Sequence, residues 1–231
     1  MQGASGGEEV ASPKGQRRHQ MPVVTIRGKL GSGVPEIGRQ VADRLHVDYV
    51  DREIIAEVAG RLHRQEQEVI AKEMPPASLR GRIAEALERS YAVGVGFEGA
   101  SLPAWQIPLD DTRYLEALKS LIRELARGQS VVIYGRGSQF ILRDYPRALH
   151  VSVVAPLEVR VRRVVEILKL NEESARQEIA RFDNSGREFI KRYFRAEIED
   201  PAHYDLVINT EHFSFEAAAS IVLEALRLKE A

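Results

Sequence analysis

The spacing of apolar residues changes at a cluster of glycines near the start of the chain. A continuous apolar run at residues 23–26 is typical of a buried strand. After the glycines, apolar residues recur at Ile37, Val41 and Leu45, which is the spacing of a helix buried on one face. The pattern therefore predicts a strand, a tight glycine turn and a helix in direct succession.

Strand and helix patterns alternate along the rest of the chain. Short apolar runs predict further strands at residues 47–50, 130–134, 149–154 and 206–208. Helical spacing predicts helices at residues 54–62, from Asp110 or Asp111 to Gly128, from Pro156 onward, at 171–194 and at 215–228. We therefore predict a three-layer α/β fold, in which a five-stranded parallel sheet carries helices on both faces and ligand sites at the carboxyl ends of its strands.

Composition divides the chain into a tail and one folded domain. Residues 1–20 lack large apolar side chains, so we predict a disordered tail, with Met21 as the natural start of translation. Residues 21–231 form the predicted domain. Within it, residues 52–112 favour a helical insertion that includes a mobile loop, while residues 171–195 are dense in basic and poor in apolar side chains, which favours a lid over a core helix.

The glycine turn is close to the phosphate-binding pattern G-x-x-x-x-G-K-[ST]. Its first six positions are filled by Gly28, Lys29, Leu30, Gly31, Ser32 and Gly33. Such a loop directs backbone N–H groups and a helix N-terminus at an anion. Val34 replaces the lysine and Pro35 the Mg²⁺-binding hydroxyl, which leaves Lys29 as the candidate cation. The alternative is a strand-to-helix turn that binds nothing.

Two polar residues follow other predicted strands. Asp51 is either a ligand-facing carboxylate or the N-cap of the next helix. Arg136 lies between Gly135 and Gly137, where a guanidinium group has room to bind phosphate oxygens; the alternative is an exposed arginine in a turn. Because the ends of parallel strands meet at one edge of a sheet, we favour phosphate binding for Arg136.

Arginines are concentrated after Pro156. Arg160, Arg162 and Arg163 fall within one helical turn, where they form either a solvated face or a cluster over an anionic ligand. The predicted lid contributes more cations, and closing them over phosphate groups is a physically reasonable use for so basic a segment.

The overall composition excludes several classes of function. A net charge of -1 over 231 residues argues against a general nucleic-acid or membrane binder, and no stretch is apolar enough to span a bilayer. The absence of cysteine excludes disulfides and thiolate chemistry and is compatible with the cytoplasm. Sequence motifs for metal ligands, nucleophile elbows and dinucleotide binding are missing, so we predict no side-chain metal site.

Four segments of the chain resemble the cytidylate kinase-like family, relatives of the P-loop nucleoside monophosphate kinases. They are GSGVPEIGRQVADRLHVDYVDREII, VVIYGRGSQFILRD, LHVSVVAPLEVRVRRV and DLVINT. The resemblance implies a P-loop kinase fold with a helical acceptor-binding insertion and an arginine-rich lid, which binds ATP, Mg²⁺ and a nucleoside monophosphate. The chain departs from cytidylate kinases at Val34 and Pro35, which make its Walker A motif degenerate, and at Tyr134 and Gly137, where they carry acidic residues.

The resemblance also implies roles for particular residues. Residues 28–34 would wrap the donor phosphates. The catalytic cations would be Lys29, Arg160, Arg163 and Arg187. The acceptor would be held by Asp51, Arg136, Arg181, Asp183 and Arg192.

Three hypotheses account for these features. The first is a cytoplasmic phosphotransferase that moves the terminal phosphoryl group of ATP to a nucleoside monophosphate, CMP or dCMP by resemblance. The second is a catalytically degenerate nucleotide-binding sensor or interaction module. The third is a kinase for another small molecule, because residues 63–111 match no acceptor site that the resemblance covers.

Overall fold

Five parallel strands form the centre of the computed structural model, which describes residues 22–51, 57, 61 and 111–230. They are β1 (Val23–Gly28), β2 (Asp48–Val50), β3 (Val131–Tyr134), β4 (Ala148–Val154) and β5 (Leu206–Asn209). Their order across the sheet is β2-β3-β1-β4-β5. The predicted parallel sheet is confirmed, and each strand coincides with one of the predicted apolar runs. The predicted tail and nearly all of the predicted insertion lie outside the described residues.

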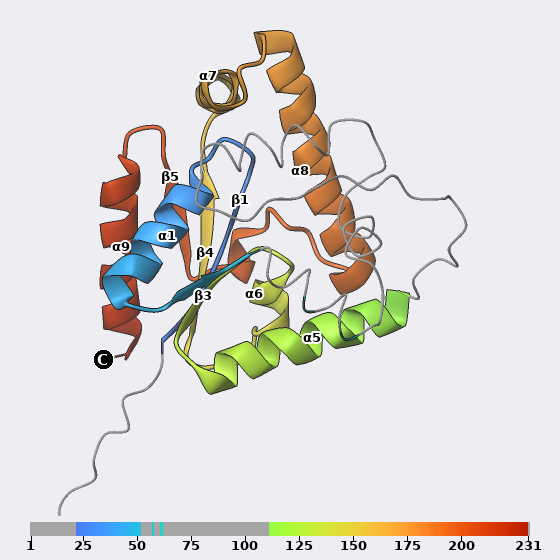
Figure 1. The fold of residues 1–231 in the computed structure, drawn as a ribbon, viewed down its shortest axis with the longest axis vertical. Helices are drawn as coiled ribbons and strands as arrows, with labels where there is room; N and C mark the ends of the chain where they lie inside the picture. Colours follow the sequence, from blue (N-terminus) through green and yellow to red (C-terminus); the bar gives the residue numbers. More distant parts are fainter. Residues whose placement is uncertain (1–21, 52–56, 58–60, 62–110, 231) are drawn as a thin grey trace, which may run out of the picture.

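Helices cover both faces of this sheet (Figure 1). The longer ones are α1 (Val34–Leu45), α5 (Asp111–Gly128), α7 (Leu157–Leu168), α8 (Glu172–Phe194) and α9 (Phe215–Glu230). α1 and α9 pack on one face, whereas α5 and the C-terminal half of α8 pack on the other. The three-layer α/β architecture is therefore confirmed.

Alternation of side chains along β1 explains how one strand serves two cores. Val24 and Ile26 belong to the core beneath α1 and α9, and Val23 belongs to the core beneath α5. All six residues of β1 are buried, because the strand lies in the middle of the sheet with β3 and β4 on either side. A central parallel strand is usually apolar on both faces, but β1 also buries two polar side chains, those of Thr25 and Arg27.

The strand order places a crevice at the carboxyl end of β1. The chain leaves β1 through α1 and reaches β2, which lies beyond β3, whereas β4 and β5 lie on the other side of β1. Connections that leave neighbouring strands in opposite directions open a gap where ligands bind in open α/β sheets. The glycine loop at residues 28–33 lies at this point.

The helix predicted at residues 171–194 contributes to two cores. Near its C-terminal end, Phe189 and Ile190 are buried against α5. Near its start, Ala175 and Ile179 form a smaller core with α7. The expectation that this stretch would be a poor core element is wrong, because its few apolar residues fall on the buried side at helical spacing. Closure of α8 over a ligand stays a prediction.

Two short helices were not predicted from the sequence. α6 (Ser138–Ile141) follows Gly137, and the 3₁₀ helix η1 (Pro201–His203) precedes β5. Each has fewer residues than are needed to show a helical repeat of apolar positions, so the spacing of side chains could not reveal them.

A polar cluster is buried on the α5 side of the sheet beside the apolar core. Thr25 Oγ1 lies 2.8 Å from His150 Nδ1, and the backbone N–H of His150 donates to Asp205. Burial lowers the pKa of His150 below its ordinary value of 6.5; the nearby Asp205 raises it and Lys229 lowers it further. The folded protein therefore holds this imidazole neutral at pH values where the unfolded chain would protonate it.

This histidine is expected to make stability depend on pH. Its contribution is complete above pH 6.5, the ordinary value, and is lost as the pH falls towards the lower pKa of the folded state. We expect the free energy of unfolding, measured with urea, to fall between about pH 7 and about pH 5.5, with a flatter slope in His150→Gln. The control is His212→Gln, since His212 is exposed. A wild-type slope in the His150 variant would contradict the assignment.

Candidate active site

The loop between β1 and α1 has the backbone shape of an anion cradle. Gly31 and Gly33 have φ angles of +80° and +90°, which are left-handed conformations that favour glycine. The N–H of Ser32 closes a turn onto the carbonyl of Lys29 at 3.0 Å. The N–H groups of Gly31 and Gly33 meet no backbone acceptor within the described part of the chain. These amides stand at the N-terminus of α1, where backbone dipoles favour an anion.

Neighbouring atoms fill the space that side chains would need at two of the glycines. A Cβ at Gly28 would lie 2.3 Å from Val34 Cγ2, and a Cβ at Gly33 would lie 2.2 Å from Phe215 Cε1. Both positions therefore require glycine for packing, and Gly33 requires it for its left-handed conformation as well. Val34 is only 1% exposed and belongs to the core beneath α1, so the position of the usual lysine is occupied by an apolar side chain.

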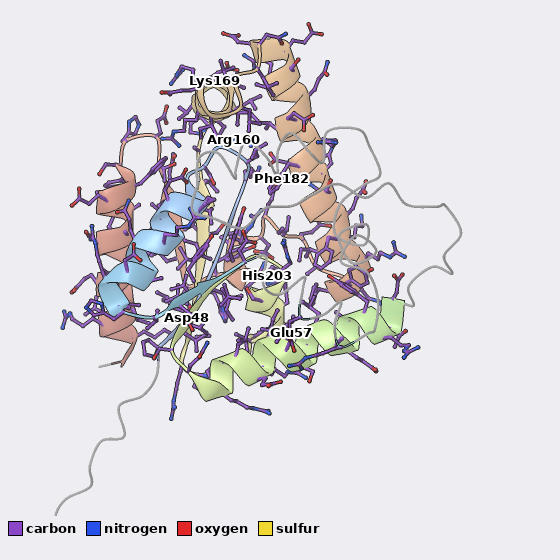
Figure 2. The ribbon with its side chains drawn as sticks, viewed as in Figure 1. Asp48, Glu57, Arg160, Lys169, Phe182 and His203 are labelled. Carbon is purple, nitrogen blue, oxygen red and sulfur yellow. The ribbon has the colours of Figure 1, made fainter. Side chains whose placement is uncertain are left out.

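Arg160 and Asp183 hold the loop at Leu30. Arg160, whose side chain is 7% exposed, donates from Nη1 to the carbonyl of Leu30 at 3.2 Å and to Asp183 Oδ2 at 2.8 Å. The other oxygen of Asp183 lies 3.4 Å from the N–H of Leu30. Figure 2 shows Arg160 between α7 and the loop that follows β1. The pair thus joins α7 and α8 to the cradle.

Arg163 and Thr210 hold the next two carbonyls. Arg163 Nη1 donates to the carbonyl of Gly31 at 3.2 Å and to Thr210 Oγ1 at 2.9 Å, while Nη2 donates to the carbonyl of Thr210 at 2.7 Å. Thr210 Oγ1 in turn donates to the carbonyl of Ser32 at 2.9 Å. The guanidinium also lies over the Phe215 ring, 4.9 Å from its centroid. Burial lowers the pKa of Arg163 from the usual arginine value, although an arginine remains charged at neutral pH.

Lys29 and Arg187 share a carboxylate beside the loop. Lys29 Nζ lies 2.9 Å from Glu199 Oε1, and Arg187 Nη2 lies 3.2 Å from the same oxygen. The hydrogen bond from Lys29 lowers the pKa of Glu199, and Arg187 adds to this effect. Two of the predicted catalytic cations are therefore brought together, and Glu199 keeps them near the cradle.

Arg136 and Asp51, which were predicted to bind the acceptor, are also brought together. They lie 3.4 Å apart, at the ends of β3 and β2. Gly135, Arg136 and Gly137 have positive φ angles of 68°, 57° and 69°. A left-handed conformation is costly for an arginine, and such strain is concentrated at functional sites.

Comparison with known proteins assigns the chain to a family. Residues 23–212 match the cytidylate kinase-like family. The chain belongs to this family. Membership and the strand order together identify the three-layer fold as that of P-loop kinases, as the sequence analysis predicted.

Relatives of this cytidylate kinase-like protein are known across most of its length. A cytidylate kinase of Staphylothermus marinus is 27% identical over 91% of this chain and 100% of its own, and one of Pyrococcus horikoshii is 26% identical over 88% of each. Among solved structures, an uncharacterized protein from Eubacterium ventriosum superposes with a TM-score of 0.63 at 16% identity, over 89% of this chain and 98% of its own. That structural likeness concerns the fold alone.

The remaining residues of the predicted lid are dispersed along α8. Arg181 pairs with Glu178 on the same helix, and Arg192 pairs with Asp111 at the start of α5. Since α8 runs from α7 to the region of α5 (Figure 1), Arg192 lies at the end of the helix away from α7. Among the predicted lid residues, Asp183 contacts the loop at Leu30, and Arg187 shares the carboxylate of Glu199 with the loop lysine, Lys29.

Sequence reasoning missed Thr210, Glu199 and Phe215 as parts of the site. Thr210 ends the segment DLVINT, which the family resemblance included, but a threonine after a strand carries no motif of its own. Glu199 and Phe215 lie far from the loop in sequence. Only the packing of the chain brings them to it.

No helix within residues 22–51 and 111–230 is long and apolar enough to cross a membrane. In the same part of the chain, no three histidine or acidic side chains are grouped so as to hold a metal ion.

Proposed function

We propose that this protein is a phosphotransferase of the nucleoside monophosphate kinase type, which uses ATP with Mg²⁺ and takes CMP or dCMP as the acceptor expected from its family. Family membership supports kinase-type phosphoryl transfer in general. The observation that carries the proposal is the cradle itself, in which left-handed glycines at the start of α1 present amides to an anion. The proposed cellular location is the cytoplasm.

In the proposed reaction, a phosphate oxygen of the acceptor attacks the terminal phosphorus of ATP, and ADP leaves. Loop residues 28–34 would hold the donor phosphates, with Lys29 supplying the nearest cation. Arg187 would join Lys29 at the transferred group once Glu199 releases them. Arg160 and Arg163 would add positive charge from behind the loop. Catalysis of this kind is positioning and charge neutralisation.

On the acceptor side, Arg136 would bind the phosphate of the monophosphate and Asp51 would lie at its entry. For Arg181, Asp183 and Arg192 to reach the acceptor as well, α8 would have to exchange their present contacts for the ligand. Of these three, Asp183 has the contacts closest to the donor loop.

Within the described residues, no three histidine or acidic side chains are grouped so as to hold a metal ion. Pro35 lacks the hydroxyl that usually binds the metal, and no group of acidic side chains replaces it within the described residues. Mg²⁺ would therefore enter as part of its complex with ATP. The roles proposed for the protein are those of its own amides and side chains, and bound Mg²⁺ would supply further positive charge at the donor phosphates.

A nucleotide sensor is the second candidate function. It is favoured by Val34, which places an apolar side chain where the phosphate-neutralising ammonium normally lies. It is also favoured by the carboxylate contacts of Lys29 and Arg187. Such a protein would bind ATP without transferring phosphate, and lid closure would be its output. A kinase acting on another small molecule shares the donor site of the first proposal and differs only in its acceptor.

A coupled ADP-release assay with a panel of nucleoside monophosphates and other small acceptors tests these functions. Turnover with CMP or dCMP supports the proposal, turnover with another acceptor supports the third function, and calorimetric ATP binding without turnover selects the sensor. A protein that neither binds ATP nor turns over would contradict all three.

Arg136→Ala tests the acceptor site. We expect the KM for the acceptor to rise about 10- to 100-fold, because charge-assisted hydrogen bonds to phosphate are lost, while the affinity for ATP changes little. Arg143→Ala is the matched control, because it removes an equal charge from an exposed position after α6. An unchanged acceptor KM in Arg136→Ala would remove the role proposed for this residue.

A further inference from the structure

Three successive carbonyls of the loop accept hydrogen bonds from the side opposite to the cradle. Leu30 accepts from Arg160, Gly31 from Arg163 and Ser32 from Thr210. The donors come from α7 and from the residue after β5, elements more than a hundred residues away along the chain. The carbonyls of residues 30–32 are therefore all held by side chains from distant parts of the chain.

The planarity of the peptide group gives these bonds a consequence on the other side. In a trans peptide the N–H points away from the C=O of the same unit. Fixing the carbonyls of residues 30–32 therefore fixes the directions of the N–H groups of Gly31, Ser32 and Gly33. A cation bonded to a carbonyl also polarises the peptide, which makes the N–H a better donor. Arg160 can thus strengthen the N–H of Gly31 as a donor to an anion without touching the anion, and Thr210 directs the N–H of Gly33 in the same way. Arg163 holds the peptide whose N–H, that of Ser32, donates to the carbonyl of Lys29, so its bond braces the turn between them.

Thr210 occupies the centre of this arrangement and is 0% exposed. Its hydroxyl accepts a hydrogen bond from Arg163 and donates one to the carbonyl of Ser32. The hydroxyl therefore acts as both acceptor and donor in holding the loop. Its own N–H donates to the carbonyl of Val154 at 2.9 Å, which ties the residue to the end of β4. Phe215 fills the space beside Gly33 and supports Arg163 from below. The threonine is therefore rigidly placed before any ligand binds.

We infer that Thr210 and Arg163 are positioning residues that preorganise the phosphate cradle and partly compensate for the missing lysine at Val34. The inference rests on the proposed function for the nature of the ligand, an oligophosphate, but not for the bracing of the loop. The family resemblance implied that Arg163 is a catalytic cation. In the present inference Arg163 acts on the loop backbone and does not contact the transferred phosphoryl group.

The test compares Thr210→Val, which keeps the shape and removes the hydroxyl, with Thr210→Ser, which keeps the hydroxyl. In hydrogen exchange of the ligand-free protein, we expect the amides of residues 29–34 to exchange several-fold faster in Thr210→Val and near the wild-type rate in Thr210→Ser. In calorimetry with inorganic tripolyphosphate, we expect about ten-fold weaker binding for Thr210→Val only. Arg162→Ala is the charge control, since Arg162 is exposed on the same helix.

Exchange and binding that remain at wild-type values in Thr210→Val would overturn the inference. If that variant does not fold, Arg163→Lys takes its place, because lysine keeps the charge and cannot make the forked contacts to Gly31 and Thr210; wild-type exchange in this variant would also overturn it. If the wild-type protein binds neither tripolyphosphate nor ATP, the proposed function fails. The exchange data then still decide whether the loop is braced.

Discussion

Replacing Val34 by lysine and Pro35 by threonine is expected to raise the rate of phosphoryl transfer by about two orders of magnitude. The lysine would place an ammonium group among the donor phosphates, and the threonine would supply the hydroxyl that binds Mg²⁺. The scaffold around both positions is already suitable, because α1 begins at Val34 and the loop glycines have the required left-handed conformations. The measurement is kcat with ATP and the preferred acceptor.

The matched control is Val34→Met with Pro35→Thr, which keeps the long unbranched stem without the charge. Because Val34 is buried against Gly28, the lysine variant should be less stable than the methionine variant without ligand and should gain more thermal stability from ATP. Equal rates for the two variants would show that the ammonium group is not what the site lacks.

Replacing Gly33 by alanine is expected to weaken ATP binding about 100-fold and to destabilise the protein by about 2–4 kcal/mol. Two causes add together. Gly33 has φ +90°, which disfavours an alanine, and the new Cβ would lie 2.2 Å from the Phe215 ring. The ring cannot withdraw without disturbing Arg163, which lies over it and holds the loop. Urea unfolding and calorimetry with ATP measure the two effects.

Gly128→Ala is the control for this variant. Gly128 ends α5, and a Cβ there would meet nothing within 4 Å, so its replacement should leave stability nearly unchanged. The double variant Gly33→Ala with Phe215→Leu separates the two causes, because it relieves the collision and keeps the backbone strain. Partial recovery of stability is expected, and no loss in Gly33→Ala alone would contradict the packing described for the loop.

Apolar spacing was sufficient to locate the strands and long helices among the described residues, because each buries a stripe or a face large enough to leave a repeat in the sequence. α6 was missed because four residues show no repeat. The burial of α8 was misjudged because its many charges hid the few apolar residues, among them Phe189 and Ile190, that enter the core.

Some residues of the candidate site could likewise be predicted from the sequence, and others could not. The glycine loop and Arg136 were recognisable because local chemistry marks them, a cluster of glycines in one case and an arginine between two glycines in the other. The contact between Arg136 and Asp51 could be anticipated only as a meeting of strand ends. No sequence motif marked Glu199 or Thr210, because the role of a single glutamate or threonine depends on its neighbours in the folded protein.

The sequence by itself determined the succession of strands and long helices along the described part of the chain, the loop with its missing lysine, and the family resemblance, because each depends on neighbouring residues. Only the tertiary structure shows that Arg160 and Arg163 donate to carbonyls of that loop, whereas Lys29 pairs with Glu199. Arg163 and Thr210 are 47 residues apart and Thr210 is 178 residues from Ser32, yet they form one hydrogen-bonded unit. Contacts at such separations depend on how the sheet and helices pack, and no short-range pattern of residue types records that packing.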